Sequence, residues 1–107
     1  MDTQYIIVLV TTPSKAEAEK ISQKLLEARL IACANIVGPV VSHFHWAGKV
    51  DQAEEFLIFM KSRASLFEEL SSEVSRLHSY EVPEILALPV VAGSKAYLEW
   101  LQSSLRP

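Results

Sequence analysis

The segment LHSYEVPEI, residues 77–85, joins a predicted helix to a predicted strand. Pro83 cannot continue the helix, because its ring removes a backbone donor, and it favours an extended conformation at Val82. The segment is therefore a shaped connection between two elements. Its polar side chains are His78, Tyr80, Glu81 and Glu84. We expect part of any functional surface here.

The elements on either side of this segment have clear signatures. Upstream, residues 65–68 (SLFE) fit a capping box, and an apolar side chain recurs at helical spacing up to His78. Downstream, residues 85–91 read as a strand that contains Pro89, which is tolerated only at a sheet edge or where its nitrogen faces away from a partner strand. A helix, a turn and an edge strand are predicted in that order.

The N-terminal part begins with an apolar run. Residues 5–11 (YIIVLVT) lack alternation, which is typical of a central strand buried on both faces. Ser14 and Glu17 fit a second capping box, with the serine oxygen accepting from the Glu17 amide and the carboxylate reaching back. The helix that follows is expected to end near Arg29.

The middle of the chain predicts a hairpin. Residues 31–37 and 40–46 read as one strand interrupted by Gly38-Pro39, which implies an edge position or a bulge. Ala47-Gly48 is a two-residue turn, and residues 54–63 form the return strand. Apolar side chains occupy both faces of that return strand.

The predicted order is βαββαβ with an extra C-terminal helix, residues 96–101, capped by Ser94. This order predicts the α+β class and a ferredoxin-like sandwich with an antiparallel sheet, formed by residues 1–107 as a single domain. Strands that are apolar on both faces would leave a large exposed patch on a monomer. We therefore expect an oligomer, with Trp100 and the Pro89 strand at the interface.

Composition excludes several classes of function. The net charge of −3 and the interspersed charges offer no footprint for nucleic acid. The three glycines form no phosphate-binding loop, which excludes nucleotide binding through such a loop but not by other means. No organic cofactor is predicted. No apolar run is long enough to span a membrane, and residues 1–5 (MDTQY) lack the basic start and small-residue cleavage site expected of a secretory signal. The single cysteine, Cys33, has no intrachain partner, and a cytoplasmic location is expected.

Three histidines are candidate metal ligands. His78 can offer an imidazole nitrogen to a divalent cation, or it can simply end a helix. His43 and His45 share one face of a strand, opposite Phe44 and Trp46, and could form a weak site for Cu(II) or Zn(II). The alternative is a solvated pair backed by aromatic residues that pack inward.

The polar residues near Pro83 also suggest a cleft between subunits. We expect Tyr80 and Glu81 to pair with a basic residue, Lys61 or Arg63, of a neighbouring chain. The other residues placed at this cleft are Trp46, Lys49 and Glu84. The cleft could bind a ligand, or it could be an interface network that only holds the subunits together. Cys33, between two alanines, is expected to be a small core residue.

These features resemble the CutA divalent-ion tolerance proteins. The matching pieces, in order, are ACANI at residues 32–36, WAGK at 46–49, SLFEEL at 65–70, HSYEVPEI at 78–85, ALP at 87–89 and YLEWL at 97–101. The resemblance covers nearly the whole chain. It implies a ferredoxin-like homotrimer with a role in tolerance to copper and other divalent cations, and no established enzymatic activity.

The chain departs from that family at the candidate metal site. The family usually has His-Pro-Tyr where this chain has His78-Ser79-Tyr80, and some relatives place a second histidine and a cysteine where this chain has Leu77 and Val10. Of the copper ligands proposed in such relatives, only His78 is present. The alternative function is a PII-like trimeric signalling module that binds a small ligand in its intersubunit clefts, which rests on fold analogy alone.

Overall fold

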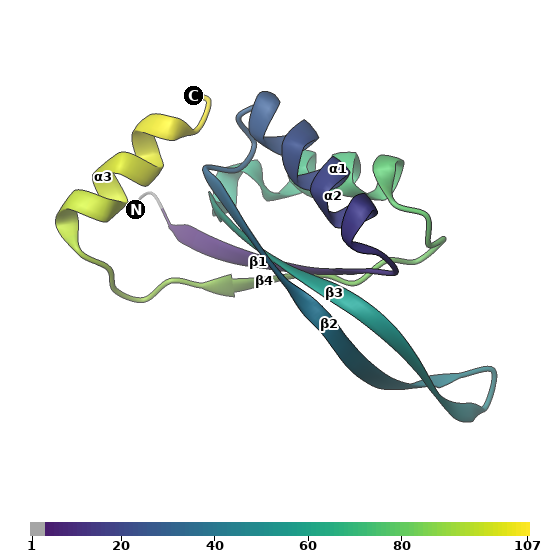
Figure 1. Ribbon diagram of the computed structural model, residues 1–107. Helices are drawn as coiled ribbons and strands as arrows, with labels where there is room; N and C mark the ends of the chain where they lie inside the picture. Colours follow the sequence, from purple (N-terminus) through teal and green to yellow (C-terminus); the bar gives the residue numbers. More distant parts are fainter. Residues whose placement is uncertain (1–3) are drawn as a thin grey trace.

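The computed structural model of the protein describes residues 4–107, and its four strands form one antiparallel sheet (Figure 1). Along the chain the elements are β1 (Tyr5–Thr12), α1 (Lys15–Glu27), β2 (Cys33–Trp46), β3 (Lys49–Arg63), a short 3-10 helix η1 (Ala64–Leu66), α2 (Phe67–Leu77), β4 (Ile85–Pro89) and α3 (Lys95–Ser104). The predicted βαββαβ order with an added C-terminal helix is confirmed, and the fold is ferredoxin-like.

Strand β1 lies in the middle of the sheet, whose strand order is β2-β3-β1-β4. The two prolines that predicted edge strands, Pro39 and Pro89, both lie in edge strands. The ladder between β2 and β3 shifts between Val37 and Val40, so the Gly38-Pro39 step is also a bulge. Strand β4 ends at Pro89, two residues before the predicted end at position 91.

Helices α1 and α2 cover one face of the sheet (Figure 1). The core lies between these helices and the sheet. The two central strands contribute alternate side chains to it, among them Val8, Val10, Ile58 and Met60, all 0% exposed. The helices contribute their own apolar stripes to this core, including Ile21, Leu25, Leu70 and Val74. Because full burial of such a side chain stabilises a fold by about 1.5–3 kcal/mol, this layer carries most of the stability.

The helix caps were predicted with mixed success. The Glu17 amide donates to the Ser14 oxygen at 3.2 Å and the Tyr97 amide donates to the Ser94 oxygen at 3.3 Å, as expected. The Glu17 carboxylate does not accept from the Ser14 amide, as the capping box predicted, because it binds Ser79 in the segment after α2. The capping box at Ser65 is wrong, since α2 begins at Phe67 and the Ser65 hydroxyl accepts from Arg63 instead.

Beyond the bulge, β2 and β3 leave the sheet as a two-stranded arm, which we define as residues 40–55 (Figure 1). The turn at its tip has positive φ at both Ala47 (51°) and Gly48 (78°), the pattern of a type I′ hairpin. Most apolar side chains of the arm are exposed, with Trp46 at 68% and Val50 at 70%. The arm therefore has no hydrophobic core of its own.

No helix in the described part of the chain covers the face of the sheet away from α1 and α2. Its apolar side chains, which we call the open sheet face, come from all four strands and are Ile7, Leu9, Val37, Leu57, Phe59, Leu86 and Leu88. The prediction that β1 and β3 are apolar on both faces is confirmed, but within one chain this second face stays partly exposed. Leu86, for example, is 56% exposed.

Helix α3 lies beside the start of β1 and is longer than predicted, with only Leu101 fully buried. Its Tyr97 and Trp100 rings pack against each other, 5.3 Å between centroids, and remain exposed. Within residues 4–107 no helix combines the length and apolar character needed to cross a membrane.

Candidate functional site

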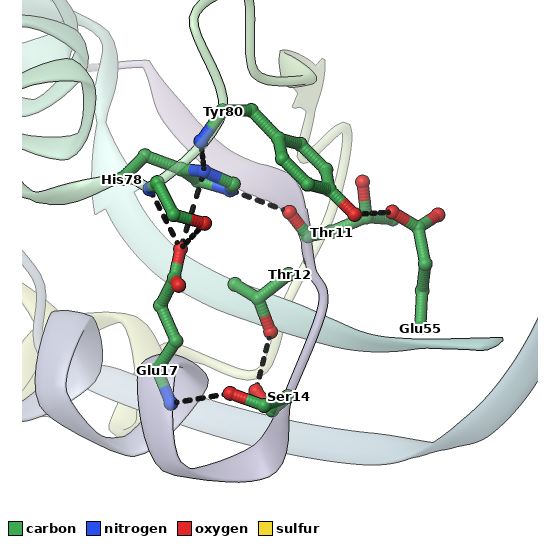
Figure 2. Close-up of polar contacts among 8 residues, drawn as sticks. Thr11, Thr12, Ser14, Glu17, Glu55, His78 and Tyr80 are labelled. Carbon is green, nitrogen blue, oxygen red and sulfur yellow. Dashed lines mark hydrogen bonds and ion pairs between the residues drawn. The ribbon is translucent and has the colours of Figure 1, made fainter. Parts of the chain in front are cut away.

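His78 is a buried residue at the end of α2. Its backbone N–H donates to the Val74 carbonyl at 2.9 Å, and its ψ of 143° ends the helix. The side chain is 0% exposed. The Nε2 atom lies 2.7 Å from the Thr11 carbonyl oxygen, and Nδ1 accepts from the Tyr80 amide at 3.0 Å (Figure 2). Since a carbonyl only accepts and an amide N–H only donates, the ring is the neutral tautomer with its proton on Nε2.

Glu17, in the first turn of α1, binds the residue after His78. One carboxylate oxygen accepts from the Ser79 amide at 2.9 Å and from the Ser79 hydroxyl at 3.0 Å, and it lies 3.3 Å from His78 Nδ1. Figure 2 shows these contacts converging on a single oxygen. A carboxylate in the first helical turn also interacts favourably with the helix dipole. Glu17 therefore ties the segment after α2 to the start of α1.

Tyr80 ties the same segment to β3. Its hydroxyl donates to the Glu55 carboxylate at 2.7 Å (Figure 2), and Glu55 is only 7% exposed. Burial, and then the neighbouring Glu55 carboxylate, raise the pKa of Tyr80 to about 12. The sequence predicted a basic partner, Lys61 or Arg63, for Tyr80. Within one chain its partner is a carboxylate, which a protonated phenol can bind as a donor.

We call these contacts the loop anchor, formed by Thr11, Glu17, Glu55, His78, Ser79 and Tyr80. It fixes the segment after α2 to three separate elements, β1, α1 and β3. Sequence reasoning found His78 and Tyr80 but missed Glu17, which binds Ser79, and Glu55, which binds Tyr80. A signal for Glu55 was available, because Glu54 and Glu55 are adjacent in a strand and point to opposite sides.

His43 and His45 lie on the arm, opposite Gln52 and Val50. Both are exposed, and neither imidazole makes a hydrogen bond to any described residue. They share a face, as predicted, while Phe44 and Trp46 point to the other side of the ribbon. Those aromatic residues do not pack inward in the single chain, where Phe44 is 37% exposed and Trp46 is 68% exposed.

The structure does not bring the three histidines together within one chain. His45 pairs with Val50 of β3, whereas His78 lies near Glu55 of β3, to which it is linked through Tyr80. Val50 and Glu55 are five residues apart, which corresponds to about 17 Å at about 3.3 Å per residue. Among residues 4–107, no group of three His, Cys, Asp or Glu side chains is placed to hold a metal ion. A multidentate site would need water or another chain to supply further ligands.

The predicted cleft residues are also spread along the chain. Trp46 and Lys49 lie opposite each other at the arm tip, and Glu81 and Glu84 are exposed on the segment after α2. The Lys61 ammonium donates to the Asn35 side chain and lies 3.7 Å from Cys33 Sγ. A cleft between subunits remains a prediction about neighbouring chains.

Two further predictions concern Cys33 and Arg63. Cys33 is half-buried beside Lys61 rather than in the core, because the strand turns its side chain away from the helices. Arg63 binds the Ser65 hydroxyl at 2.9 Å, the Gln102 side chain and the Arg106 carbonyl, so it holds the C-terminal segment.

A cavity of about 320 Å³ lies elsewhere, between the end of α1, α2 and the C-terminal segment. It is lined by Ala28, Leu30, Glu69, Ser72, Glu73 and Arg106. Two ion pairs, Glu69 with Arg106 and Glu73 with Arg76, already neutralise its carboxylates. None of the residues predicted as ligands lines this cavity.

The chain resembles known proteins along nearly all of its length. A family model described as CutA1 divalent ion tolerance protein matches residues 6–104. "Protein CutA, chloroplastic" of Arabidopsis thaliana is 43% identical over 94% of this chain, which spans only 56% of the length of that relative. The divalent-cation tolerance protein CutA of Archaeoglobus fulgidus is 42% identical over 92% of this chain and 95% of its own length.

A solved structure supports the same relationship. The divalent cation tolerance protein Cut A1 of Thermus thermophilus superimposes with a TM-score of 0.93 at 40% sequence identity, covering 95% of this chain and 99% of the other. The family model and the solved structure thus match nearly the same length of the chain. The chain therefore belongs to the CutA1 divalent ion tolerance protein family.

Proposed function

We propose that this chain is a non-enzymatic, cytoplasmic homotrimer that binds divalent cations such as copper, with the exposed His43 and His45 pair as the metal-contacting group. The observation that carries this proposal is the pairing, on one face of the arm, of two imidazoles that bind no other residue among positions 4–107. Imidazole is a good ligand for Cu(II) and Zn(II). Two ligands from one chain fit a weak site in which water or a neighbouring chain fills the other positions.

His78 takes a different part in this proposal. Both of its ring nitrogens are bound within the chain, and its side chain is buried. A metal at His78 would have to displace the Tyr80 amide from Nδ1 or lose the bond to Thr11. We therefore assign His78 a positioning role and His43 and His45 the metal contact.

The open sheet face supports the homotrimer. Leu88 and Val37, each about half exposed, border the half-buried Leu9 and Phe59 on a continuous apolar surface. Patches of this kind on soluble proteins mark interaction sites. A second copy presents the same apolar sheet, so packing between sheets of identical chains would cover it.

Calorimetric titration with Cu(II) and Zn(II) tests the metal assignment. We expect binding at micromolar concentrations that is lost in the H43N/H45N variant and kept in D51N, a control on the other face of the arm. If H78N alone abolished binding while H43N/H45N retained it, the assignment to the arm would be wrong. If neither variant changed the affinity, these histidines would not be the site.

Light scattering tests the oligomer, with an expected mass of three times the 12.0 kDa of one chain. Substituting L86D on the open sheet face should lower this mass. Nucleotide screening by thermal shift addresses the PII-like alternative, since a ligand at about one hundred times its Kd adds about 2.7 kcal/mol to folded-state stability. Stabilisation by ATP or ADP, without metal binding, would favour that alternative.

A further inference from the structure

Lys61 of β3 is a cation without a carboxylate partner in its own chain. Because side chains alternate along a strand, Lys61 lies on the same side of β3 as Phe59 and belongs to the open sheet face. Its ammonium donates to the Asn35 side chain and lies 3.7 Å from Cys33 Sγ. No carboxylate among residues 4–107 forms an ion pair with it. A second copy that covers this face therefore buries an uncompensated charge unless it brings an anion, and such burial is costly.

Glu55 is a carboxylate on the same side of β3, and its charge is also incompletely compensated. It is only 7% exposed, and its Oε2 atom accepts from the Tyr80 hydroxyl at 2.7 Å (Figure 2). In the described chain no cation pairs with Glu55, and its second oxygen, Oε1, accepts no hydrogen bond. Oε1 is not sealed from solvent, unlike the hydroxyl oxygen of Ser22, which is fully buried without a partner. The carboxylate therefore has one oxygen open to a donor from outside the chain.

Lys61 and Glu55 cannot meet within one chain. They are six residues apart on β3, which corresponds to about 20 Å at about 3.3 Å per residue. A second copy displaced along the strands can place its Lys61 at the Glu55 of the first. The two sides of such an interface use different surfaces, and repeating it by rotation closes a ring. One such cation and one such anion per chain then leave no member of the ring unpaired.

We propose that Lys61 of one copy binds the Oε1 atom of Glu55 in the next copy, so that Tyr80 and a neighbouring chain hold one carboxylate from two sides. The proposal rests on the homotrimer proposed above and assigns a specific charge pair to each of its interfaces. Tyr80, by binding Oε2, positions the carboxylate for the neighbouring ammonium. Arg63, the other basic residue predicted beside Tyr80, is already engaged by Ser65 and the C-terminal segment.

The pair predicts a pattern of losses that a single structural residue does not produce. Removing one member of a buried charge pair leaves the other charge uncompensated, whereas removing both is close to neutral. K61M keeps the apolar stem of the lysine, and E55Q keeps a carbonyl oxygen that can accept from Tyr80. Each should raise the concentration at which half of the chains dissociate by about tenfold or more. The double variant K61M/E55Q should recover most of that loss.

Sedimentation velocity over a dilution series, at a fixed urea concentration below the unfolding transition, measures this assembly. Circular dichroism checks that each variant is folded. The matched controls are E19Q, K20M and E19Q/K20M, because both residues are exposed on α1, on the other side of the sheet from the open sheet face. These substitutions should leave the dissociation concentration unchanged.

Zero-length coupling locates the contact. A carbodiimide activates the Glu55 carboxylate, and the Lys61 amine then displaces a urea and forms an amide bond. If 15N-labelled and unlabelled chains are mixed before coupling, peptides should appear that join a labelled position 55 to an unlabelled position 61. K61R keeps the positive charge, so it should still assemble but give no such peptide.

The outcomes separate this pair from the homotrimer itself. Additive losses in the K61M/E55Q cycle, in a wild type that is a trimer, would overturn the charge pair and leave the homotrimer standing. Coupling of positions 55 and 61 only within chains of one label would do the same. A wild-type monomer would overturn both proposals together.

Discussion

The Nε2 atom of His78 lies 2.7 Å from the carbonyl oxygen of Thr11, so the end of α2 is hydrogen-bonded to the last part of β1. The two residues are 67 positions apart. The other ring nitrogen, Nδ1, accepts a hydrogen bond from the Tyr80 amide. A histidine that resembled a metal ligand in sequence therefore has a structural role that can be measured without metal.

Replacing His78 with alanine should destabilise the protein by about 3 kcal/mol, because the buried Thr11 carbonyl and Tyr80 amide lose their partners and a cavity remains. Urea unfolding at fixed protein concentration measures this as a lower midpoint with an unchanged slope. H43A on the exposed arm is the control and should cost less than about 0.5 kcal/mol. Equal effects of the two substitutions would contradict a structural role for His78.

Glu17 and Ser79 should be energetically coupled. E17A should cost about 1–2 kcal/mol, since one carboxylate oxygen accepts from both the amide and the hydroxyl of Ser79. The ψ of 143° at His78 allows proline at position 79, but proline donates neither bond. A double-mutant cycle should therefore find E17A much less costly in an S79P background. Additive effects in that cycle would show that Glu17 acts elsewhere.

Gly38 and Gly48 should respond to alanine for different reasons. G38A should cost about 1–3 kcal/mol, because its Cβ would meet the Phe56 ring at 2.4 Å. G48A meets nothing within 4 Å and is strained only by its φ of 78°, which costs about 1 kcal/mol. Thermal unfolding of both variants measures the difference. A larger loss in G48A than in G38A would mean that the Phe56 ring can move aside at little cost.

Tyr80 should make stability fall at alkaline pH. Its pKa is raised from 10.0 to about 12 in the folded chain, so between these values the unfolded tyrosine loses its proton first and unfolding becomes easier. The contribution of the Tyr80 hydroxyl to the free energy of unfolding is fully present below about pH 10 and is lost as the pH rises through about 12. Absorbance titration of tyrosinate should show one late step that Y80F removes. Unfolding curves for Y80F should depend less on pH in this window.

Local signals in the sequence predicted most of the architecture. Ser14 and Ser94 cap helices because their partners lie three residues away, and Pro39 and Pro89 mark edge strands because proline lacks a donor. Ser65 failed for a physical reason: the guanidinium of Arg63 takes its oxygen, and a 3-10 turn precedes α2. A pattern four residues long does not reveal such a competitor.

The site was harder to predict, because its contacts join residues far apart in the chain. Glu55 and Tyr80 are 25 positions apart, and Glu17 and Ser79 are 62 apart. The sequence identified a polar cluster around position 80 but not the elements to which it is bound. Within one chain the fold places the Glu55 carboxylate against the Tyr80 hydroxyl, and the basic partner expected from a neighbouring chain remains a prediction.

The arm also determines how a single chain would move through solution. The described residues extend 44 Å along their longest axis but only 26 and 22 Å along the others. A separated chain would therefore have a high frictional coefficient for its mass and would elute early from a sizing column. Assembly that packs the arms against neighbouring copies would give a more compact particle with less friction per unit mass. The sedimentation coefficient would then increase on association by more than it would if the assembly were as elongated as the single chain.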